Sequence, residues 1–193
     1  MGRDIPRILT QDEREALLDV FSERYDSPFR NKCIIALMLS TGLRPSEVTD
    51  LKPVHLRDEG RIVVRDGKGN KDRSVWAGQD VVATLTRWRE RAPESEWLFC
   101  TSEGHQIDTR YLRDMVPRYA EKADINEPEE VSPMTMRHTF ATELYRSCGR
   151  IQVVSRALGH EDVSTTMIYT HIVDEEVQDA MQSLWSDKKG FPV

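Results

Sequence analysis

Hydrophobic residues recur at helical spacing through the first fifty residues, and this pattern predicts three successive helices. The first is expected over residues 10–24, because Thr10 and Glu13 have the spacing of a capping box. The second is apolar around most of its girth, so we expect it to be central. It should end at Gly42, since glycine readily takes the left-handed conformation of a helix C-cap. The third is short and begins at Pro45, because proline suits the first turn of a helix.

The hydrophobic period changes after residue 60. Residues 61–65 are rich in valine and isoleucine, residues 66–72 contain two glycines and an asparagine, and residues 73–76 are again suited to a strand. This pattern predicts a β-hairpin. Residues 97–99 are expected to add a third short strand to the hairpin.

Most of the remaining chain shows helical periodicity. The acidic residues 124–130 contain a proline and are expected to form a solvated loop. The chain should therefore be mainly α-helical with a small antiparallel β-sheet, an α+β fold. Helices are expected over residues 79–91, 109–123, 133–147, 150–158 and 174–185, with a short one capped by Asp162 or Ser164.

Composition indicates a globular protein with an unremarkable net charge. The 193 residues include 33 acidic and 27 basic side chains, which gives a formal charge of −6. That balance argues mildly against nucleic acid as a partner, although binding depends on where basic side chains cluster. Residues 61–73 are the clearest basic segment, with five basic and two acidic side chains. By itself such a segment is more often a solvated hairpin tip than a binding surface.

Cysteine usage and hydropathy point to a cytoplasmic location. Cys33, Cys100 and Cys148 are far apart and in no C-x-x-C spacing, so we expect reduced thiols. The longest apolar run, 33–39, is too short to cross a membrane, and the polar N-terminus is unlike a signal peptide. Consecutive carboxylates such as those at 174–176 fan apart on a helix, so no metal site is expected there. No cofactor is expected either.

Four short segments, in their order along the chain, indicate a specific function. Together they resemble the catalytic domain of the tyrosine recombinase (phage integrase) family, and the resemblance covers nearly the whole chain. It implies the fold of the DNA breaking-rejoining enzymes. The segments are Thr41-Gly42-Leu43-Arg44-Pro45-Ser46-Glu47, Gly67-Lys68-Gly69-Asn70-Lys71, Arg137-His138-Thr139-Phe140-Ala141-Thr142, and Leu158-Gly159-His160 with Tyr169 nine residues later.

The resemblance implies a metal-independent enzyme that cleaves and rejoins DNA through a 3′-phosphotyrosyl intermediate. Two arginines would grip the phosphate, a hairpin lysine would protonate the leaving oxygen, and a tyrosine would attack. Any one of these residues alone would more often be a packing or ion-paired side chain. The implied catalytic residues are Arg44, Lys68, Arg137, His160 and Tyr169. From the basic hairpin, Lys71 and Arg73 are expected as DNA contacts. Glu47 lies one helical turn after Arg44, so it is expected to contact and orient that arginine.

One position departs from the family pattern. Met134 stands where the family has a histidine, and methionine can neither accept the tyrosine proton nor donate to phosphate. His138 lies one turn further along, and we expect it to be structural. The departure motivates an alternative, a DNA-binding accessory or regulatory relative with weakened catalysis. A metal-dependent hydrolase is a third hypothesis, which loss of activity in EDTA would support.

The resemblance also implies a domain arrangement. Residues 1–173 would form the catalytic domain, and residues 174–193 would form a C-terminal helix and tail able to dock on a neighbouring protomer. The N-terminal core-binding domain of the family is expected to be absent from this sequence. The implied partner is double-stranded DNA, bound by a tetrameric synapse, with no membrane association. A prokaryotic, archaeal, viral or mobile-element origin would fit the family.

Overall fold

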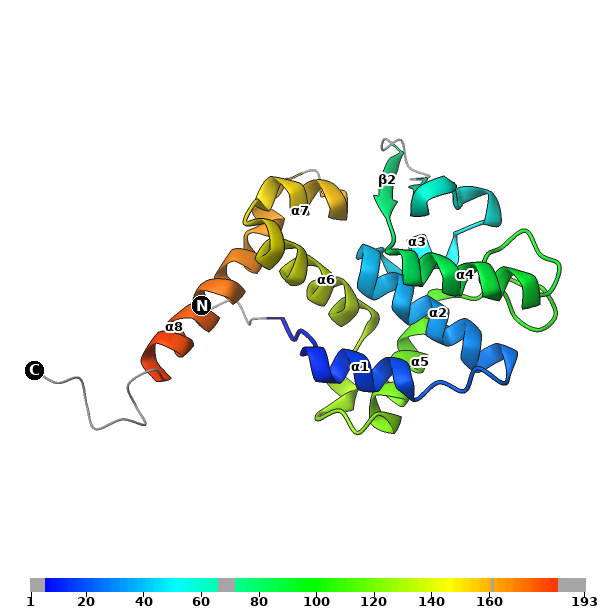
Figure 1. The fold of residues 1–193 in the computed structure, drawn as a ribbon, viewed down its shortest axis with the longest axis horizontal. Helices are drawn as coiled ribbons and strands as arrows, with labels where there is room; N and C mark the ends of the chain where they lie inside the picture. Colours follow the sequence, from blue (N-terminus) through cyan, green and yellow to red (C-terminus); the bar gives the residue numbers. More distant parts are fainter. Residues whose placement is uncertain (1–5, 66–71, 161, 184–193) are drawn as a thin grey trace, which may run out of the picture. The chain divides into compact units, whose positions relative to one another are not determined.

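The computed structural model describes residues 6–65, 72–160 and 162–183 (Figure 1). The chain divides into two compact units, a larger one of Pro6–Phe140 and a smaller one that contains the residues from Ala141 onward. The boundary falls inside helix α6 (Pro133–Cys148). The expected fold class is confirmed, because the described chain is mostly helical with a two-stranded antiparallel sheet.

The larger unit contains most of the secondary structure, including the whole sheet. Its elements are α1 (Gln11–Asp19), α2 (Asp26–Thr41), α3 (Pro45–Thr49), η1 (Pro53–His55), η2 (Asp58–Gly60), β1 (Arg61–Val64), β2 (Arg73–Trp76), α4 (Gln79–Arg91), α5 (Thr109–Lys122), η3 (Pro128–Glu130) and the start of α6. The smaller unit contains the rest of α6, α7 (Ile151–Leu158), η4 (Val163–Thr166) and α8 (Ile168–Ser183). The η elements are short 3₁₀ helices.

Helix α1 begins as its sequence predicts but ends early. Thr10 and Glu13 form the capping box, with each side chain bonded to the backbone N–H of the other residue at 2.8 and 3.2 Å. The expected extension to residue 24 is wrong, because the helix stops at Asp19. Phe21 instead turns into the core, where its ring stacks on Tyr119 with 4.0 Å between centroids.

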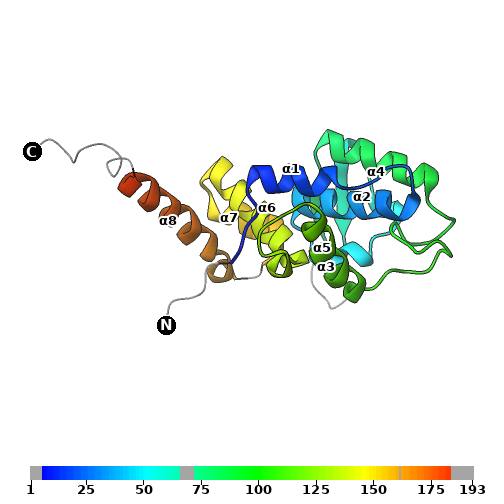
Figure 2. The ribbon, with the colours of Figure 1, turned by 90° about the horizontal axis from the view of Figure 1, so that it is seen from below.

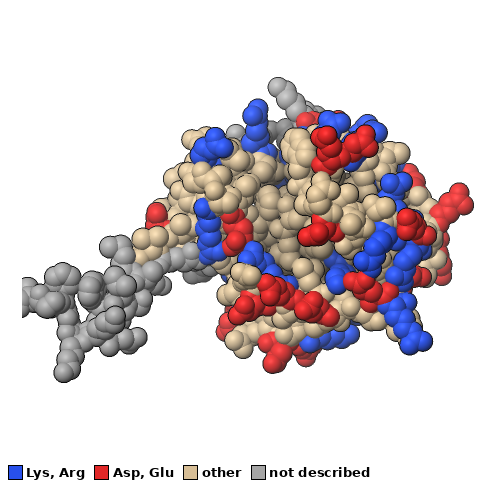
Figure 3. Space-filling model, viewed as in Figure 1, with Lys and Arg blue, Asp and Glu red and all other residues tan. Residues whose placement is uncertain are grey.

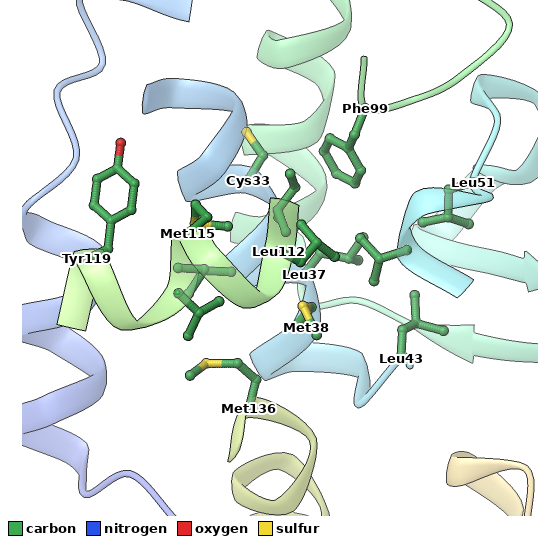
Figure 4. Packing of buried hydrophobic residues seen from close by; sticks show 14 of the residues in the cluster. Cys33, Leu37, Met38, Leu43, Leu51, Phe99, Leu112, Met115, Tyr119 and Met136 are labelled. Atoms are coloured by element: carbon green, nitrogen blue, oxygen red, sulfur yellow. The ribbon is translucent and has the colours of Figure 1, made fainter. Parts of the chain in front are cut away.

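Helix α2 is central to the larger unit, as its apolar girth predicts. Leu37 and Met38 are fully buried against α5 residues such as Leu112 and Met115, and Met136 of α6 lies on the same cluster (Figure 4). Helix α4 runs beside α2 in both ribbon views (Figures 1 and 2). The helix ends at Gly42, whose φ of 63° is the left-handed cap conformation predicted from sequence.

The β-hairpin has the predicted strands. Val64 of β1 pairs with Arg73 of β2 in an antiparallel register. Lys68 and Lys71 fall in residues 66–71, which lie outside the described residues. The expected third strand at residues 97–99 is wrong. The backbone N–H of Leu98 donates to the carbonyl of Leu51 at 2.7 Å, and its carbonyl accepts from the Trp88 indole at 2.8 Å, so neither group joins a strand ladder.

The C-terminal helix begins earlier than its sequence pattern suggests. Helix α8 starts at Ile168, whereas a start at Asp174 is expected from its amphipathic stripe. Residues 168–183 contain neither glycine nor proline, so nothing interrupts the helix before that stripe. The predicted cap at Asp162 is confirmed, since its carboxylate accepts from the backbone N–H of Ser164 at 2.8 Å. Within the described ranges, no helix is long and apolar enough to cross a membrane.

Candidate active site

Arg44 stands at the first turn of α3, directly after the left-handed turn that ends α2. Pro45 follows it at the first helical position, which fixes the start of the helix. The Glu47 carboxylate reaches back to Arg44 and accepts from its backbone N–H at 2.7 Å and from its Nη1 at 3.1 Å. The predicted Arg44–Glu47 contact is therefore confirmed. The Arg44 side chain remains 38% exposed and accessible to a ligand.

Arg137 projects from α6 to the same turn. Its side chain is only 2% exposed, and its Nη1 donates to the carbonyl of Gly42 at 2.6 Å. Gly42 and Arg137 are 95 residues apart in sequence. The structure thus brings two of the predicted site residues together, because Arg44 and Arg137 are both held at the turn formed by residues 42–44. A buried guanidinium with a fixed acceptor is already oriented before any ligand arrives.

Glu47 has a second arginine partner, which the sequence pattern did not reveal. Nη1 and Nη2 of Arg73 donate to Oε1 and Oε2 of Glu47 at 2.6 and 2.8 Å, a bidentate fork. Burial by itself raises the pKa of Glu47. The hydrogen bonds and charge of Arg73, together with those of Arg44, outweigh burial and leave that pKa below its ordinary value. Glu47 is therefore a carboxylate near neutral pH.

Met134 lies beside Arg44. Its side chain is 42% exposed, so it is accessible from the surface. It contributes to a surface cavity of about 350 Å³ together with residues of α3 and α5. The position that departs from the family pattern therefore adjoins the arginine turn. The cavity is lined by Arg44, Pro45, Ser46, Thr109, Arg113 and Met134.

His138 is next to Arg137 on α6. Burial lowers the pKa of His138, and the charge of Arg137 lowers it further. A neutral imidazole is therefore favoured at neutral pH. The structural role expected for His138 stays a prediction.

The smaller unit carries the other two described site residues. Gly159 ends α7 in the left-handed conformation, with a φ of 67°, and His160 follows it. Nδ1 of His160 is 2.8 Å from Oγ1 of the buried Thr166, which fixes the plane of the ring. Tyr169 lies in the first turn of α8 and is 2% exposed.

The sequence pattern did not reveal one contact of the candidate site residues. Arg73 is expected from its charge to face a DNA phosphate, and the structure places its guanidinium on Glu47, 26 residues away in sequence. Alternation within a four-residue strand gives no signal for such a contact. In the part of the chain that the structure describes, no three histidine, cysteine or carboxylate side chains are grouped to hold a metal ion.

Comparison with known proteins extends these observations. The family model described as "Phage integrase family" matches residues 7–176. Tyrosine recombinase XerD of Ralstonia nicotianae is 37% identical over 186 residues, which cover 90% of this chain and 58% of that protein. Tyrosine recombinase XerA of Thermococcus kodakarensis is 35% identical over 185 residues, 93% of this chain and 63% of that protein. The chain thus spans about three fifths of the length of these curated relatives.

Solved structures give the same result. A crystal structure of XerA recombinase matches with a TM-score of 0.81 and 30% identity, covering 94% of this chain and 66% of that one. XerH site-specific recombinase, bound to a palindromic difH substrate in a post-cleavage complex, matches with a TM-score of 0.79 and 28% identity. That match covers 92% of this chain and 53% of the XerH chain. The similarity therefore extends over nearly all of the sequence.

Proposed function

The chain belongs to the phage integrase family, and we propose that it is the catalytic domain of a site-specific recombinase that cleaves and rejoins DNA through Tyr169. The observation that best supports this function is the meeting of Arg44 and Arg137 at one turn. Arg137 is buried and bonds to the carbonyl of Gly42. Arg44 lies two residues after Gly42 and is held by Glu47. Two arginines held at one turn can bind one phosphate group together, which two independent surface arginines could not do as well.

The two arginines would stabilise the charge that develops on the phosphate. A guanidinium presents a planar fork to the non-bridging oxygens and stays protonated at any working pH. Because both side chains are held in place beforehand, little reorganisation is needed when the phosphorane forms. Removing one such preorganised donor typically costs about 10²–10³-fold in rate.

The covalent step would be carried by Tyr169, with Lys68 and His160 assisting. The oxygen of Tyr169 attacks phosphorus, the bond to the 5′ oxygen breaks, and the 3′ end stays attached to the tyrosine. The tyrosine loses its proton to a base or to water, and the departing 5′ oxygen takes a proton, for which Lys68 is the proposed donor. His160 would donate a hydrogen bond to the phosphate. Rejoining is the reverse reaction with a 5′-hydroxyl, so no high-energy cofactor is required.

Double-stranded DNA is the proposed partner, since the similar XerH structure contains a difH substrate. Basic and acidic side chains are interspersed on the face shown in Figure 3. We expect this domain to bind DNA weakly, mainly through phosphate-facing arginines and the hairpin that contains Lys68 and Lys71, with affinity that falls as salt rises. Action on DNA inside the cell, as a tetramer on paired sites, is part of the same proposal.

Residues 174–193 are the proposed protomer-exchange element. The first ten of them continue α8, the helix whose first turn carries Tyr169. Wherever this helix docks, its position therefore constrains the backbone of the nucleophile. Docking on a neighbouring protomer would couple assembly to cleavage, whereas docking on its own domain is the simpler arrangement without DNA. Residues 184–193 lie outside the described residues.

The alternative of a catalytically weakened DNA-binding relative depends on Met134 alone. Its place in the same cavity as Arg44 gives that alternative a physical basis. It is nevertheless not favoured, because the relatives reported above are themselves named as recombinases.

A nicked suicide duplex tests the proposal. Cleavage next to the nick releases a short fragment, so the covalent complex cannot be reversed and accumulates. We expect an adduct that resists denaturation, forms in EDTA and is absent from Tyr169→Phe. DNA binding without an adduct would support the accessory function instead, and activity abolished by EDTA would support a metal-dependent hydrolase.

A further inference from the structure

Glu47 is the point where two elements of the larger unit are joined. Its side chain is 11% exposed, and each carboxylate oxygen accepts two hydrogen bonds. Oε1 accepts from Arg44 and Arg73 at 3.1 and 2.6 Å. Oε2 accepts from the Arg44 backbone N–H at 2.7 Å and from Arg73 at 2.8 Å. A carboxylate has about four acceptor sites, so this one is saturated.

The two arginines on this carboxylate differ in exposure and in geometry. Arg73 is 15% exposed and uses both terminal nitrogens on Glu47, whereas Arg44 is 38% exposed and places one nitrogen there. Arg73 is therefore committed to the carboxylate, and Arg44 is the arginine that faces outward. A negative charge shared in this way holds Arg44 without cancelling the positive charge of the pair.

Arg73 also lies at the loop end of the hairpin strands. It is the first residue of β2 and pairs with Val64 of β1, immediately beyond the segment that contains Lys68. The fork between Arg73 and Glu47 consequently ties the hairpin to α3. One ion pair thus links β2 to the helix at whose start Arg44 lies.

We propose that Arg73 is a positioning residue for strand cleavage, which acts through Glu47 on Arg44, and does not serve mainly as a DNA contact. The inference rests on the proposed function, since Arg44 must bind the scissile phosphate for its placement to affect a rate. A small displacement of such a group can slow a reaction by roughly 10²-fold.

Arg73→Lys separates positioning from DNA contact, because it keeps the charge and removes the fork. With the complete chain and the suicide duplex at saturating concentration, cleavage in a single turnover should fall by roughly 10²-fold. The dissociation constant for DNA and its salt dependence should stay as in the unmodified chain. Reduced affinity with an unchanged cleavage rate would make Arg73 a DNA contact and overturn the inference.

Arg91→Lys is the matched control. Arg91 places Nε and Nη2 on Oδ1 of Asp26 at 3.1 and 2.7 Å, which is also an arginine–carboxylate pair of the larger unit. It belongs to α4 and has no place in the proposed site. Its replacement should leave both cleavage and DNA affinity unchanged. A loss of cleavage equal to that of Arg73→Lys would indicate general destabilisation and contradict the inference.

The backbone amide of Arg44 gives a readout that needs no catalysis, because it donates directly to Glu47. Its nuclear magnetic resonance signal should shift, and its hydrogen exchange should accelerate, in Arg73→Lys but not in Arg91→Lys. If the unmodified chain forms no adduct, the proposed function fails, and the Arg44 amide still decides whether Arg73 places Arg44. An unchanged amide in Arg73→Lys overturns the inference in either case.

Discussion

Replacing Arg137 by lysine is the sharpest perturbation of the proposed phosphate site. The substitution keeps one positive charge on α6 but removes the planar fork. In the structure, Nη1 of Arg137 is committed to the carbonyl of Gly42 at 2.6 Å, and the side chain is 2% exposed. A single ammonium is a point charge and cannot both hold this carbonyl and grip a phosphate oxygen in the same geometry.

The size of the effect depends on which bond the lysine loses, the one to the Gly42 carbonyl or the one to the phosphate. A hydrogen bond to a charged donor contributes about 1.5–3 kcal/mol, and leaving a buried acceptor unsatisfied costs a similar amount. If lysine keeps its bond to Gly42, the chain remains folded, but the phosphate loses a preorganised donor and cleavage falls by about 10²–10³-fold. If lysine turns to the phosphate, the same bond is lost from the fold and thermal stability decreases.

Single-turnover cleavage of the suicide duplex and thermal melting, measured on the same preparation, check this expectation. Arg146→Lys is the control, since it makes the same change on α6, where Arg146 bonds to Glu143 one turn away. We expect little effect from the control. Cleavage and melting of Arg137→Lys that both matched the unmodified chain would refute the assignment of Arg137 to the phosphate.

Three further predictions concern Met134, Glu47 and residues 174–193. Met134→His should raise the single-turnover cleavage rate, with a gain bounded by the roughly 10²–10⁴-fold typical of general acid–base assistance, and an unchanged rate would mean that another group or water takes the tyrosine proton. Glu47 has a lowered pKa in the folded chain, so its stabilisation is present above the ordinary value of about 4.3 and is lost as pH falls through the folded pKa. Glu47→Gln should therefore flatten the loss of stability on acidification below that pH, as measured by chemical denaturation. Deleting residues 174–193 should weaken cooperative assembly on DNA, seen by gel shift, more than it lowers the melting temperature, and outright unfolding would contradict the exchange proposal.

Local sequence signals predicted much of the fold. The capping box at Thr10, the left-handed cap at Gly42 and the hairpin strands each depend on residues close in sequence, and all three are present. The errors arise where tertiary contacts decide. Leu98 looks like a strand residue, but its backbone groups bond to Leu51 and Trp88, and no local pattern contains that information.

In the candidate site, too, the sequence predicted the local contact but not the contacts between distant segments. Family resemblance proposed Arg44 and Arg137 as separate candidate residues, and the spacing of Arg44 and Glu47 by one helical turn predicted their contact. The carbonyl that holds Arg137 is 95 residues away in sequence, and the partner of Arg73 is 26 residues away. Such contacts depend on how elements pack, so they could be read only from the structure.

Identification of the residue that becomes linked to DNA tests the central claim most directly. Tyr169 is the only tyrosine between Arg156 and Lys188, so trypsin should release it in a peptide of residues 157–188. After the adduct is digested with trypsin and nuclease, mass spectrometry should find the nucleotide remnant on this peptide, joined through the 3′ phosphate. A remnant on a peptide that contains Tyr111 or Tyr145, or one joined through a 5′ phosphate, would contradict the account.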